Sequence, residues 1–433
     1  MGETYDVAVE KDIVISVHPE FASQRIGDYA WKARADEFDL LVEAGGCEVV
    51  ESVRMNVRRI ISATLFGAGK VEDIRLLVEA REAAVVFVDH PLTPVQQSKL
   101  ETAWAAKVVD RTGLILEIFA SRARTREGIL QVELASLNYQ MGRLVRSWTH
   151  LERQRGGVGF MGGPGERQIE LDRRMIRDKI ISLEKDLEKI KRMRATQRAG
   201  RRKKDMPTVA LVGYTNAGKS TLFNRLTHSG VYVADQLFAT LDPTLRLLEL
   251  DDSLRLMLSD TVGFVQELPH ELVDAFKATL EEVIEADLIL HVRDASSPML
   301  AEQGRVVYET LEQLGLFGDF SPPIVEVMNK MDLVPELTSY RGESISGSRI
   351  AASAATGEGM DELLVLLGDW LQQEMHELHL KLLISDGRSI AFCHQHGAVL
   401  SKTANDEVMD IVVRLNPADA VRFTEESGIH SLR

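Results

Sequence analysis

The sequence predicts an α/β fold in four parts, and this prediction rests on three observations. Apolar strand-like runs alternate with helical patterns over residues 1–118 and again over 206–375, which is typical of mostly parallel sheets flanked by helices. Between these regions, apolar residues recur at heptad spacing on both sides of a glycine-rich stretch, which predicts a long antiparallel helical hairpin over 119–205. Two strand-like runs around two helical segments predict a small α+β domain over 376–433.

The first region is expected to form a small α/β domain. Residues 12–16, 83–89 and 106–111 are strand-like, and 70–83 has a helical pattern. Gly67, Gly69 and Lys70 stand at the expected start of that helix, where a weak phosphate site is conceivable, with ATP as its candidate ligand. The alternative is a tight turn that feeds an ordinary helix.

The hairpin is predicted from its heptads and is distinguished by its charge. Between Arg122 and Lys204 there are 22 lysines and arginines against 10 acidic residues, although the whole chain carries a net charge of −15. A polyanionic partner is therefore expected to meet this segment. The apolar seam is expected along Leu130, Leu134, Leu137, Met141, Leu144, Trp148 and Leu151, and then along Ile169, Ile176, Ile180, Leu183, Leu187 and Ile190.

The glycine-rich stretch at 156–165 is expected to be the tip of the hairpin. Gly157, Gly159 and Gly162 match the spacing of a dinucleotide-binding turn, but such a turn follows a strand, and here a helix is expected before it. We interpret the tip as an RNA-contacting loop, the alternative being a merely flexible turn. The candidate RNA contacts are Arg153, Arg155, Phe160, Met161 and Arg167.

The strand-like run 208–214 leads into GYTNAGKS, which satisfies the G-x-x-x-x-G-K-[ST] pattern of a phosphate-binding P-loop. Glycine lets backbone N–H groups converge on phosphate oxygens, Lys219 is expected to pair with the β- and γ-phosphates, and Ser220 to ligate Mg²⁺. Asn216 is a candidate ligand of K⁺, or else it shapes the loop through a hydrogen bond. The loop comprises Gly213, Tyr214, Thr215, Asn216, Ala217, Gly218, Lys219, Ser220 and Thr221.

Two further segments are expected to sense the γ-phosphate. In FATLDPT, Thr240 is the candidate contact to Mg²⁺ and phosphate, although Thr244 lies nearby. In SDTVG, Asp260 would hold the metal through water, and the Gly263 N–H would meet the γ-phosphate. These segments contribute the candidates Phe238, Ala239, Thr240, Leu241, Asp242, Asp260, Thr261, Val262 and Gly263. The catalytic candidates are Lys219, Thr240 and Gly263, and the candidate metal ligands are Ser220, Thr240 and Asp260.

The choice of base is expected to depend on the strand end PPIVEVMNKMD. The Asp332 carboxylate can accept from guanine N1–H and N2–H₂, whereas adenine presents no such pair of donors. Asn329 would brace the loop, Lys330 would cover the base, and the backbone of Ser353 and Ala354 could contact guanine O6. The candidates are Asn329, Lys330, Met331, Asp332, Ser353, Ala354 and Ala355. Together the motifs predict a P-loop GTPase domain that takes GTP or GDP with Mg²⁺.

Phe264 follows Asp-Thr-Val-Gly, the position at which many GTPases carry a glutamine that orients the attacking water. A phenylalanine ring cannot make that polar contact. We therefore expect slow intrinsic GTP hydrolysis that is accelerated when a partner orders the switch segments or supplies a group.

The chain resembles the HflX family of bacterial GTPases over residues from about 60 to 375. The resemblance is carried by DTVGFVQELPHELVDAFKATLEEVIEADLILHVRDAS, FATLDPT, EIFASRARTREGILQVELASLNYQ, HLERQRGGVGF and GGPGERQIELDRR. It implies a GTPase that binds the large (50S) ribosomal subunit near the peptidyl transferase centre of 23S rRNA and, in some members, splits stalled ribosomes under stress. Two departures, at 141–144 and at Arg167, lie near the expected contact surface.

The remaining sequence features limit other classes of function. No apolar run is long enough to span a bilayer, and the acidic start does not resemble a secretory signal, so a cytoplasmic protein is expected. For partners, we expect a monomer that does not bind DNA. Cys47 and Cys393 are isolated thiols, and Cys393, His394 and His396 lack a strong zinc spacing. The alternative function is a signalling or membrane-linked GTPase whose hairpin binds a protein; peripheral membrane association stays open.

Overall fold

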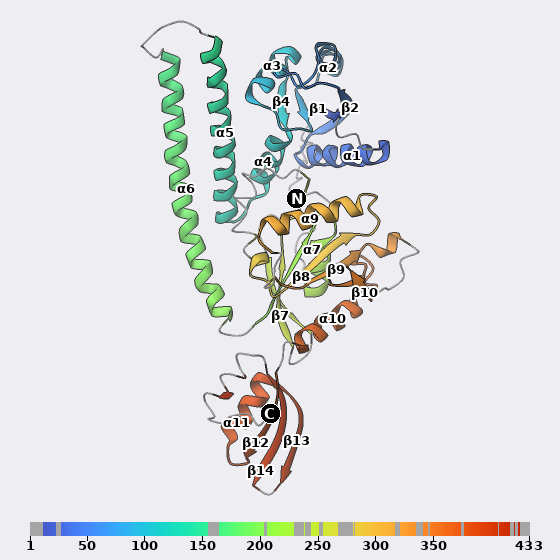
Figure 1. Ribbon diagram of the computed structural model, residues 1–433, viewed down its shortest axis with the longest axis vertical. Coiled ribbons are helices and arrows are strands. Elements are labelled where there is room, and N and C mark those ends of the chain that lie inside the picture. Colours follow the sequence, from blue (N-terminus) through green and yellow to red (C-terminus); the bar gives the residue numbers. More distant parts are fainter. Residues whose placement is uncertain are drawn as a thin grey trace, which may run out of the picture.

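The computed structural model describes residues 12–22, 27–154, 164–202, 206–228, 238, 244–250, 254–266, 280, 282–316, 321–334, 341–344, 347–373, 376–405, 407–415, 420 and 423–424. The N-terminal domain and the nucleotide-binding domain lie one above the other, with the helical hairpin along their side and the C-terminal domain at the far end (Figure 1). This architecture confirms the predicted fold class.

The N-terminal domain has a four-stranded parallel sheet in the order β2-β1-β3-β4. Its strands are β1 (Ile13–Phe21), β2 (Glu48–Val57), β3 (Val85–Val88) and β4 (Lys107–Asp110). Its helices are α1 (Asp28–Ala44), α2 (Ala68–Arg81), α3 (Pro94–Trp104) and α4 (Arg111–Arg122). One face of the sheet packs against α2 and α3 around the buried Trp104 and Phe66, and the other face packs against α1 and α4 around Phe38 and Phe119.

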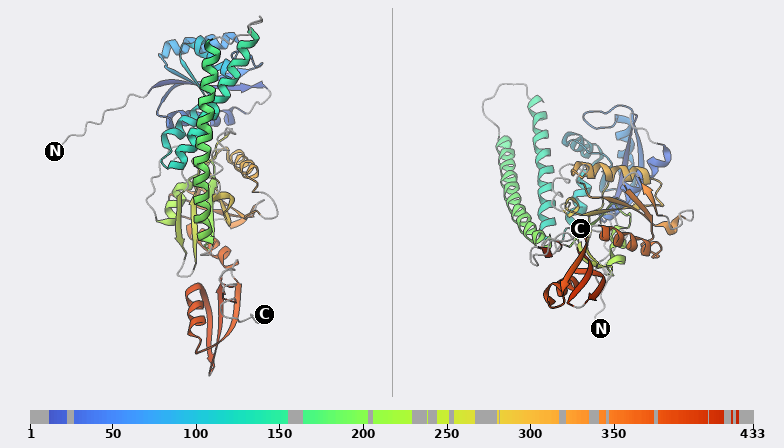
Figure 2. Two further views of the ribbon diagram at one scale, coloured as in Figure 1. Left: turned by 90° about the vertical axis from the view of Figure 1, so that its left-hand side faces the viewer. Right: turned by 60° about the horizontal axis from the view of Figure 1, so that its bottom comes forward.

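The hairpin consists of α5 (Arg126–Gln154) and α6 (Pro164–Arg202), and α6 runs alongside both the N-terminal and the nucleotide-binding domain (Figure 2). The heptad prediction is confirmed for the middle of the predicted seam, because the contact between the helices has a core of Leu137, Ile180 and Leu183. Leu187 and Ile190 are half-buried and lie outside this cluster. Leu130, Leu134, Met141 and Ile176 pack against this core. The side chains of Leu144, Trp148, Leu151 and Ile169, and those of the RNA-contact candidates, lie outside the described part of the chain.

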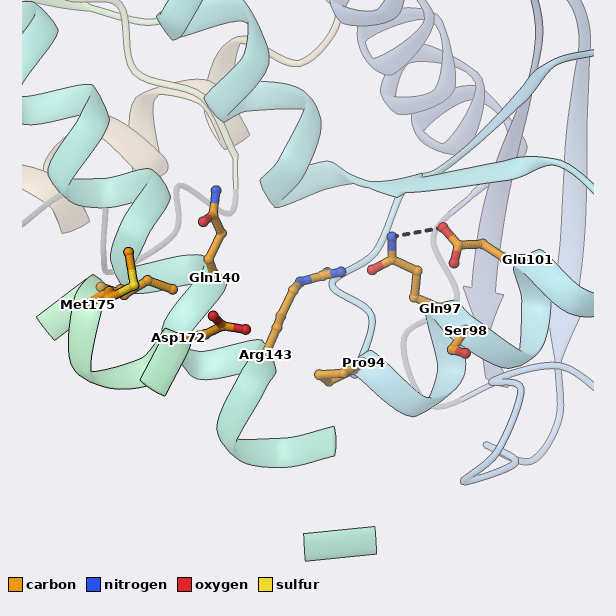
Figure 3. A pocket seen from close by; sticks show the side chains of 9 residues that line it. Pro94, Gln97, Ser98, Glu101, Gln140, Arg143, Asp172 and Met175 are labelled. Atoms are coloured by element: carbon orange, nitrogen blue, oxygen red, sulfur yellow. Dashed lines mark hydrogen bonds between the residues drawn. The ribbon is translucent and has the colours of Figure 1, made fainter. Parts of the chain in front are cut away.

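The hairpin is attached to the N-terminal domain through Asp110. The Tyr139 hydroxyl donates to Asp110 Oδ1 at 2.5 Å, and Arg143 donates to Asp110 Oδ2 at 2.8 Å. Beside this joint, α3 and the hairpin border a cavity of about 640 Å³ (Figure 3). The cavity is lined by Pro94, Gln97, Ser98, Glu101, Gln140, Arg143, Asp172, Met175 and Ile176.

The nucleotide-binding domain has a seven-stranded sheet in the order β10-β11-β9-β8-β5-β7-β6, parallel except at its two edge strands. Its strands are β5 (Thr208–Gly213), β6 (Thr244–Glu249), β7 (Arg255–Asp260), β8 (Leu288–Asp294), β9 (Ile324–Asn329), β10 (Arg341–Ser344) and β11 (Gly347–Ala351). Its helices are α7 (Lys219–Thr227), α9 (Leu300–Gln313), the 3₁₀ turn η2 (Met331–Leu333) and α10 (Met360–Gln373). The central strands β5, β8 and β9 are almost entirely buried, as their continuous apolar runs predict.

The C-terminal domain is a three-stranded antiparallel sheet in the order β12-β14-β13 with one helix packed on it. It contains β12 (His376–Leu383), α11 (Gly387–His396), β13 (Gly397–Asn405) and β14 (Val408–Leu415). The prediction of two helical segments between the strands was wrong for the second segment, because residues 397–405 pair with β14 as an edge strand. Among the described residues, no group of three or more metal-ligating side chains is placed to hold an ion, and Cys393 is buried in the core of this domain.

Candidate nucleotide-binding site

The P-loop connects the end of β5 to the start of α7, and its backbone follows the glycine pattern for steric reasons. Gly218 has a φ of 88°, and a Cβ at this position would lie 2.2 Å from Asn329 Nδ2. A Cβ on Gly213 would lie 2.2 Å from the carbonyl oxygen of Val292. Asn216 also adopts a left-handed conformation, with a φ of 60°. The loop thus turns the N-terminus of α7, which favours an anion, towards the carboxyl edge of the sheet.

Lys219 is buried, and its ammonium group donates to the carbonyl oxygens of Gly213 at 3.1 Å and Tyr214 at 2.9 Å. Burial lowers the pKa of Lys219 to about 8, and the negative charge of Asp260 only partly offsets this effect. The lysine is therefore held over the loop by two backbone acceptors while its positive charge lacks full solvation. Such a group is suited to a polyanionic ligand.

Asp260, at the end of β7, lies beside the P-loop. The Ser220 hydroxyl donates to Asp260 Oδ2 at 2.7 Å, so two oxygen ligands of the kind that Mg²⁺ prefers stand together at the start of α7. Thr261 turns away from them, and its hydroxyl donates to the carbonyl oxygen of Leu211 at 2.6 Å. The structure thus brings Ser220 and Asp260 together.

Gly263 approaches the P-loop closely. A Cβ on Gly263 would lie 2.9 Å from Thr215 Cγ2 and 3.0 Å from Lys219 Nζ. A side chain at this position would have to displace Thr215 or Lys219, so glycine allows the backbone to lie next to the lysine. Of the first switch segment, FATLDPT, the structure describes the buried Phe238 and Thr244, the first residue of β6; Ala239, Thr240, Leu241 and Asp242 lie outside the described residues.

Asn329 links the P-loop to the other end of the site. Its Nδ2 donates to the Ala217 carbonyl at 2.8 Å, and its Oδ1 accepts from the Ala354 N–H at 2.9 Å. The side chain is buried, so it joins three loops that come from distant parts of the sequence. Met331, which follows in η2, is buried beneath the same edge.

Asp332 is exposed at the edge of the sheet, and its Oδ1 accepts a hydrogen bond of 2.6 Å from the Ser353 hydroxyl. Lys330 has a φ of 63°, and its ammonium group pairs with Asp294 Oδ2 at 2.7 Å. These contacts fix one carboxylate oxygen of Asp332 and hold the ammonium group of Lys330 against Asp294.

Two residues that the sequence did not indicate support this part of the site. Arg225, in α7, donates to the carbonyl oxygens of Ala355 at 3.2 Å and Thr356 at 2.6 Å. Asp294, at the end of β8, positions Lys330. Both partners lie far from these residues along the chain, and an isolated arginine or aspartate carries no motif, so no local pattern could have identified them.

The N-terminal glycine–lysine segment has a different geometry. Ala68, Gly69 and Lys70 are the first three residues of α2, and Lys70 is half exposed and pairs with Asp73 at 3.2 Å. The same Ala-Gly-Lys tripeptide in the P-loop has its glycine in the left-handed conformation before the helix and its lysine buried. The N-terminal segment is thus built as an ordinary helix start.

Replacing Asn329 with alanine is expected to lower the free energy of unfolding by about 2–4 kcal/mol, because a buried donor and a buried acceptor lose their partners. Urea denaturation of the two proteins without nucleotide measures this difference. Asn329→Asp serves as the second variant, since it keeps the acceptor for Ala354 but places a buried carboxylate oxygen against the Ala217 carbonyl, so its loss of stability should be at least as large. An unfolding midpoint unchanged in both variants would show that the bridge contributes nothing to stability.

Comparisons with known proteins agree with this geometry. Family profiles described as GTP-binding GTPase N-terminal, GTP-binding GTPase Middle Region and 50S ribosome-binding GTPase match residues 32–120, 122–201 and 208–330. No helix among the described residues is long and apolar enough to cross a membrane.

Several relatives are similar over almost the whole chain. GTPase HflX of Magnetococcus marinus is 51% identical over 391 residues, which cover 90% of each chain. GTPase HflX of Escherichia coli K12 is 46% identical over 393 residues, covering 90% of this chain and 91% of the relative. GTPase HflX of Lacrimispora saccharolytica is 44% identical over 376 residues, which cover 87% of this chain and 88% of the relative. These similarities agree with a site that joins the P-loop, Asp260 and the Asn-Lys-Met-Asp segment. The chain belongs to the HflX family of GTPases.

Proposed function

We propose that this GTPase binds the large (50S) ribosomal subunit in its GTP state, hydrolyses GTP faster when bound, and dissociates stalled or idle 70S ribosomes. The observation that supports this most directly is a basic hairpin attached to the domain that carries the nucleotide site. The described part of α6 exposes the cationic side chains Arg173, Arg174, Arg177, Lys179, Lys185, Lys189, Lys191 and Arg192. The family profile over 208–330 is named for 50S binding, which points to the same partner.

In this proposal the hairpin tip meets 23S rRNA near the peptidyl transferase centre, and the protein acts in the cytoplasm as a monomer during stress. Arg153, Arg155 and Arg167 would meet phosphates, and Phe160 with Met161 would stack on bases or pack against them. An exposed cationic helix favours a polyanion over a protein partner, since rRNA provides a continuous row of phosphates.

The nucleotide site would work through positioning and charge. Lys219 would pair with the β- and γ-phosphates, the Gly263 N–H and Thr240 would contact the γ-phosphate, and Asp332 would accept from the guanine edge. The Ser220 and Asp260 oxygens fit a hard divalent cation, so these residues with Thr240 would hold Mg²⁺, which neutralises phosphate charge when bound. Phe264 is buried, so a water-orienting group has to come from elsewhere, which agrees with hydrolysis that depends on a partner.

Cosedimentation with 50S subunits tests the proposal. The protein should pellet with 50S in a non-hydrolysable GTP analogue, pellet less with GDP, and lose binding as salt increases. GTP hydrolysis should rise when 50S is added, and 70S profiles should shift towards free subunits. The double variant Phe160→Ser/Met161→Ser should weaken pelleting while GTP binding stays unchanged. If hydrolysis is equally fast with and without 50S and nothing pellets, the alternative of a signalling GTPase with a protein partner is favoured.

We further propose that Asn216 helps to hold K⁺ against the phosphates. Its left-handed backbone is one that glycine also adopts, so Asn216→Gly removes the side chain without straining the loop. Hydrolysis should be faster in KCl than in NaCl at equal ionic strength for the natural protein, and equal in both salts for Asn216→Gly. Equal rates in the natural protein would leave Asn216 a loop-shaping role only. An ATP site at Lys70 stays a prediction without a supporting contact.

A further inference from the structure

The junction between β4 and α4 joins the hairpin to the nucleotide site. Asp110 accepts hydrogen bonds from Tyr139 and Arg143 of α5, so it holds the hairpin. The next residue, Arg111, is 1% exposed and donates to the carbonyl oxygen of Gln266 at 3.2 Å. Gln266 lies three residues after Gly263, the residue expected to meet the γ-phosphate. Two neighbouring side chains therefore contact the hairpin and residues 260–266, which we call the second switch segment.

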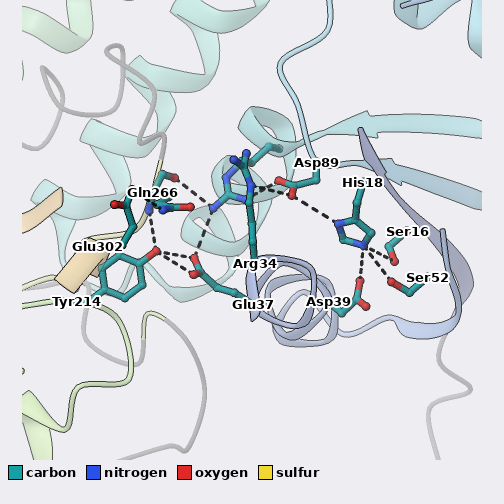
Figure 4. A network of polar contacts seen from close by, with 11 residues as sticks. Ser16, His18, Arg34, Glu37, Asp39, Ser52, Asp89, Tyr214, Gln266 and Glu302 are labelled. Atoms are coloured by element: carbon teal, nitrogen blue, oxygen red, sulfur yellow. Dashed lines mark hydrogen bonds and ion pairs between the residues drawn. The ribbon is translucent and has the colours of Figure 1, made fainter. Parts of the chain in front are cut away.

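Glu37 and Tyr214 form a second contact across the same domain boundary (Figure 4). The hydroxyl of Tyr214, in the P-loop, lies 2.8 and 2.9 Å from the two carboxylate oxygens of Glu37 in α1 and donates to that group. The same hydroxyl accepts from the Gln266 N–H at 3.0 Å. The Arg111 guanidinium lies 3.5 Å from Glu37 Oε1. Arg111, Glu37 and Tyr214 thus form one linked group, which contacts both the carbonyl oxygen and the N–H of Gln266.

The second switch segment is also joined to the P-loop through its backbone. The Phe264 N–H donates to the Gly213 carbonyl at 3.1 Å, and the Thr215 N–H donates to the Phe264 carbonyl at 2.8 Å. The rings of Phe264 and Tyr214 are buried in one apolar cluster with Phe38 of α1 and residues of α4. A movement of the N-terminal domain would therefore displace both the P-loop and the second switch segment, which surround Lys219.

The first switch segment also contacts helix α4. Phe238 lies edge-on to Phe119 of α4, with ring centroids 4.6 Å apart. Phe238 is two residues from Thr240 in the sequence. Thus α4 contacts residues of both segments that are expected to sense the γ-phosphate.

Arg111 is held in the N-terminal domain by an ion pair with Asp89. Arg111 donates to Asp89 Oδ1 at 2.6 Å. Burial acts to raise the pKa of Asp89, but the positive charges of Arg111 and its other neighbours outweigh burial and hold the pKa at about 2. The Arg111–Asp89 pair is therefore charged throughout the neutral range, which keeps the guanidinium in place beside Gln266.

We propose that Arg111, Glu37 and Tyr214 are positioning residues through which the N-terminal domain and its hairpin set the position of Gly263 beside Lys219, so that hairpin binding and γ-phosphate binding are coupled. The coupling to the ribosome rests on the function proposed above, whereas the positioning of Gly263 does not. Because such coupling is reciprocal, GTP should favour the hairpin arrangement that the partner binds, and the partner should favour the γ-phosphate contact.

The test uses the full-length protein with variants on either side of the contact. Glu37→Met removes the acceptor at nearly constant length, Tyr214→Phe removes only the hydroxyl, and the double variant closes a double-mutant cycle. Glu37→Gln restores an acceptor and should restore function in part. Glu43→Gln, an exposed acid on the same helix, is the matched control. Melting temperatures verify that each variant is folded.

The first measurement is the ratio of the GDP to GTP-analogue dissociation constants in the free protein. It should fall about fivefold or more in Glu37→Met and in Tyr214→Phe, within the usual range of coupling energies. In Glu37→Met, which lies in α1 outside the P-loop, GDP affinity should not fall comparably. The double variant should be no worse than either single variant, because both break the same contact. A ratio equal to that of Glu43→Gln, in folded variants, would overturn the positioning role.

The second measurement is the stimulation of GTP hydrolysis by 50S subunits, which should fall in the same variants while their pelleting with 50S is retained. Variants that pellet and are stimulated like the natural protein would overturn the coupling. If the natural protein neither pellets nor is stimulated, the function proposed above fails, and the dissociation-constant ratio in the free protein still decides the positioning role.

Discussion

Lys219→Ala should reduce GTP hydrolysis by about 10³-fold and weaken GTP binding, the largest effect on activity expected for a single change in this protein. The loss follows from removing a buried cation that is held over the P-loop by two carbonyl oxygens, where the low local dielectric makes its attraction for phosphate strong. Single-turnover hydrolysis and fluorescent-nucleotide titration measure the two losses separately.

Lys70→Ala is the matched control for this experiment, because Lys70 also ends an Ala-Gly-Lys tripeptide at a helix start. The Lys70 side chain is half exposed and its ammonium group pairs with Asp73 on the same helix, so GTP binding and hydrolysis should stay at the level of the natural protein. A loss in Lys70→Ala as large as in Lys219→Ala would show that the measured hydrolysis does not come from the P-loop alone. An undiminished rate in Lys219→Ala would contradict the assignment of the site.

Asp332→Asn should change base selectivity from guanine to xanthine. The Ser353 hydroxyl holds Oδ1, so in the variant the amide nitrogen occupies the place of the second carboxylate oxygen and offers a donor there. Guanine presents a donor at its 2-position and xanthine presents a carbonyl, so GTP should lose affinity and XTP should gain it. The loss of two charge-assisted hydrogen bonds, about 1.5–3 kcal/mol each, corresponds to roughly 10²–10⁴-fold for GTP.

Competition between GTP and XTP for a fluorescent nucleotide measures the change in both proteins. The natural protein should prefer GTP and the variant XTP, and this reversal serves as the internal control for folding. If the variant loses affinity for both nucleotides equally, Asp332 supports the structure of the site instead of reading the base.

The P-loop and the base-recognition segment could be predicted from the sequence because the residues of each motif are close together in the chain. Gly213 and Gly218 permit backbone conformations or close approaches that a Cβ would block, and a buried strand before them and a helix after them are visible as periodicity. The heptads of the hairpin are equally local, so the contacts of Leu137 with Ile180 and Leu183 follow from the spacing. At residues 397–405 the local pattern was insufficient, because pairing with β14 determines that strand.

The sequence by itself determined that the protein has a P-loop site for a guanine nucleotide and a basic hairpin beside it. Both depend on short-range patterns, namely motifs of a few residues, heptad spacing and local charge. Only the tertiary structure decided which Ala-Gly-Lys segment has a buried lysine in a loop built for phosphate and which begins an ordinary helix. It alone also revealed that Glu37 and Arg111 meet Tyr214 and Gln266, residues up to 177 positions apart in the chain. Such contacts depend on how domains pack, and a single side chain carries no local signal of its distant partner.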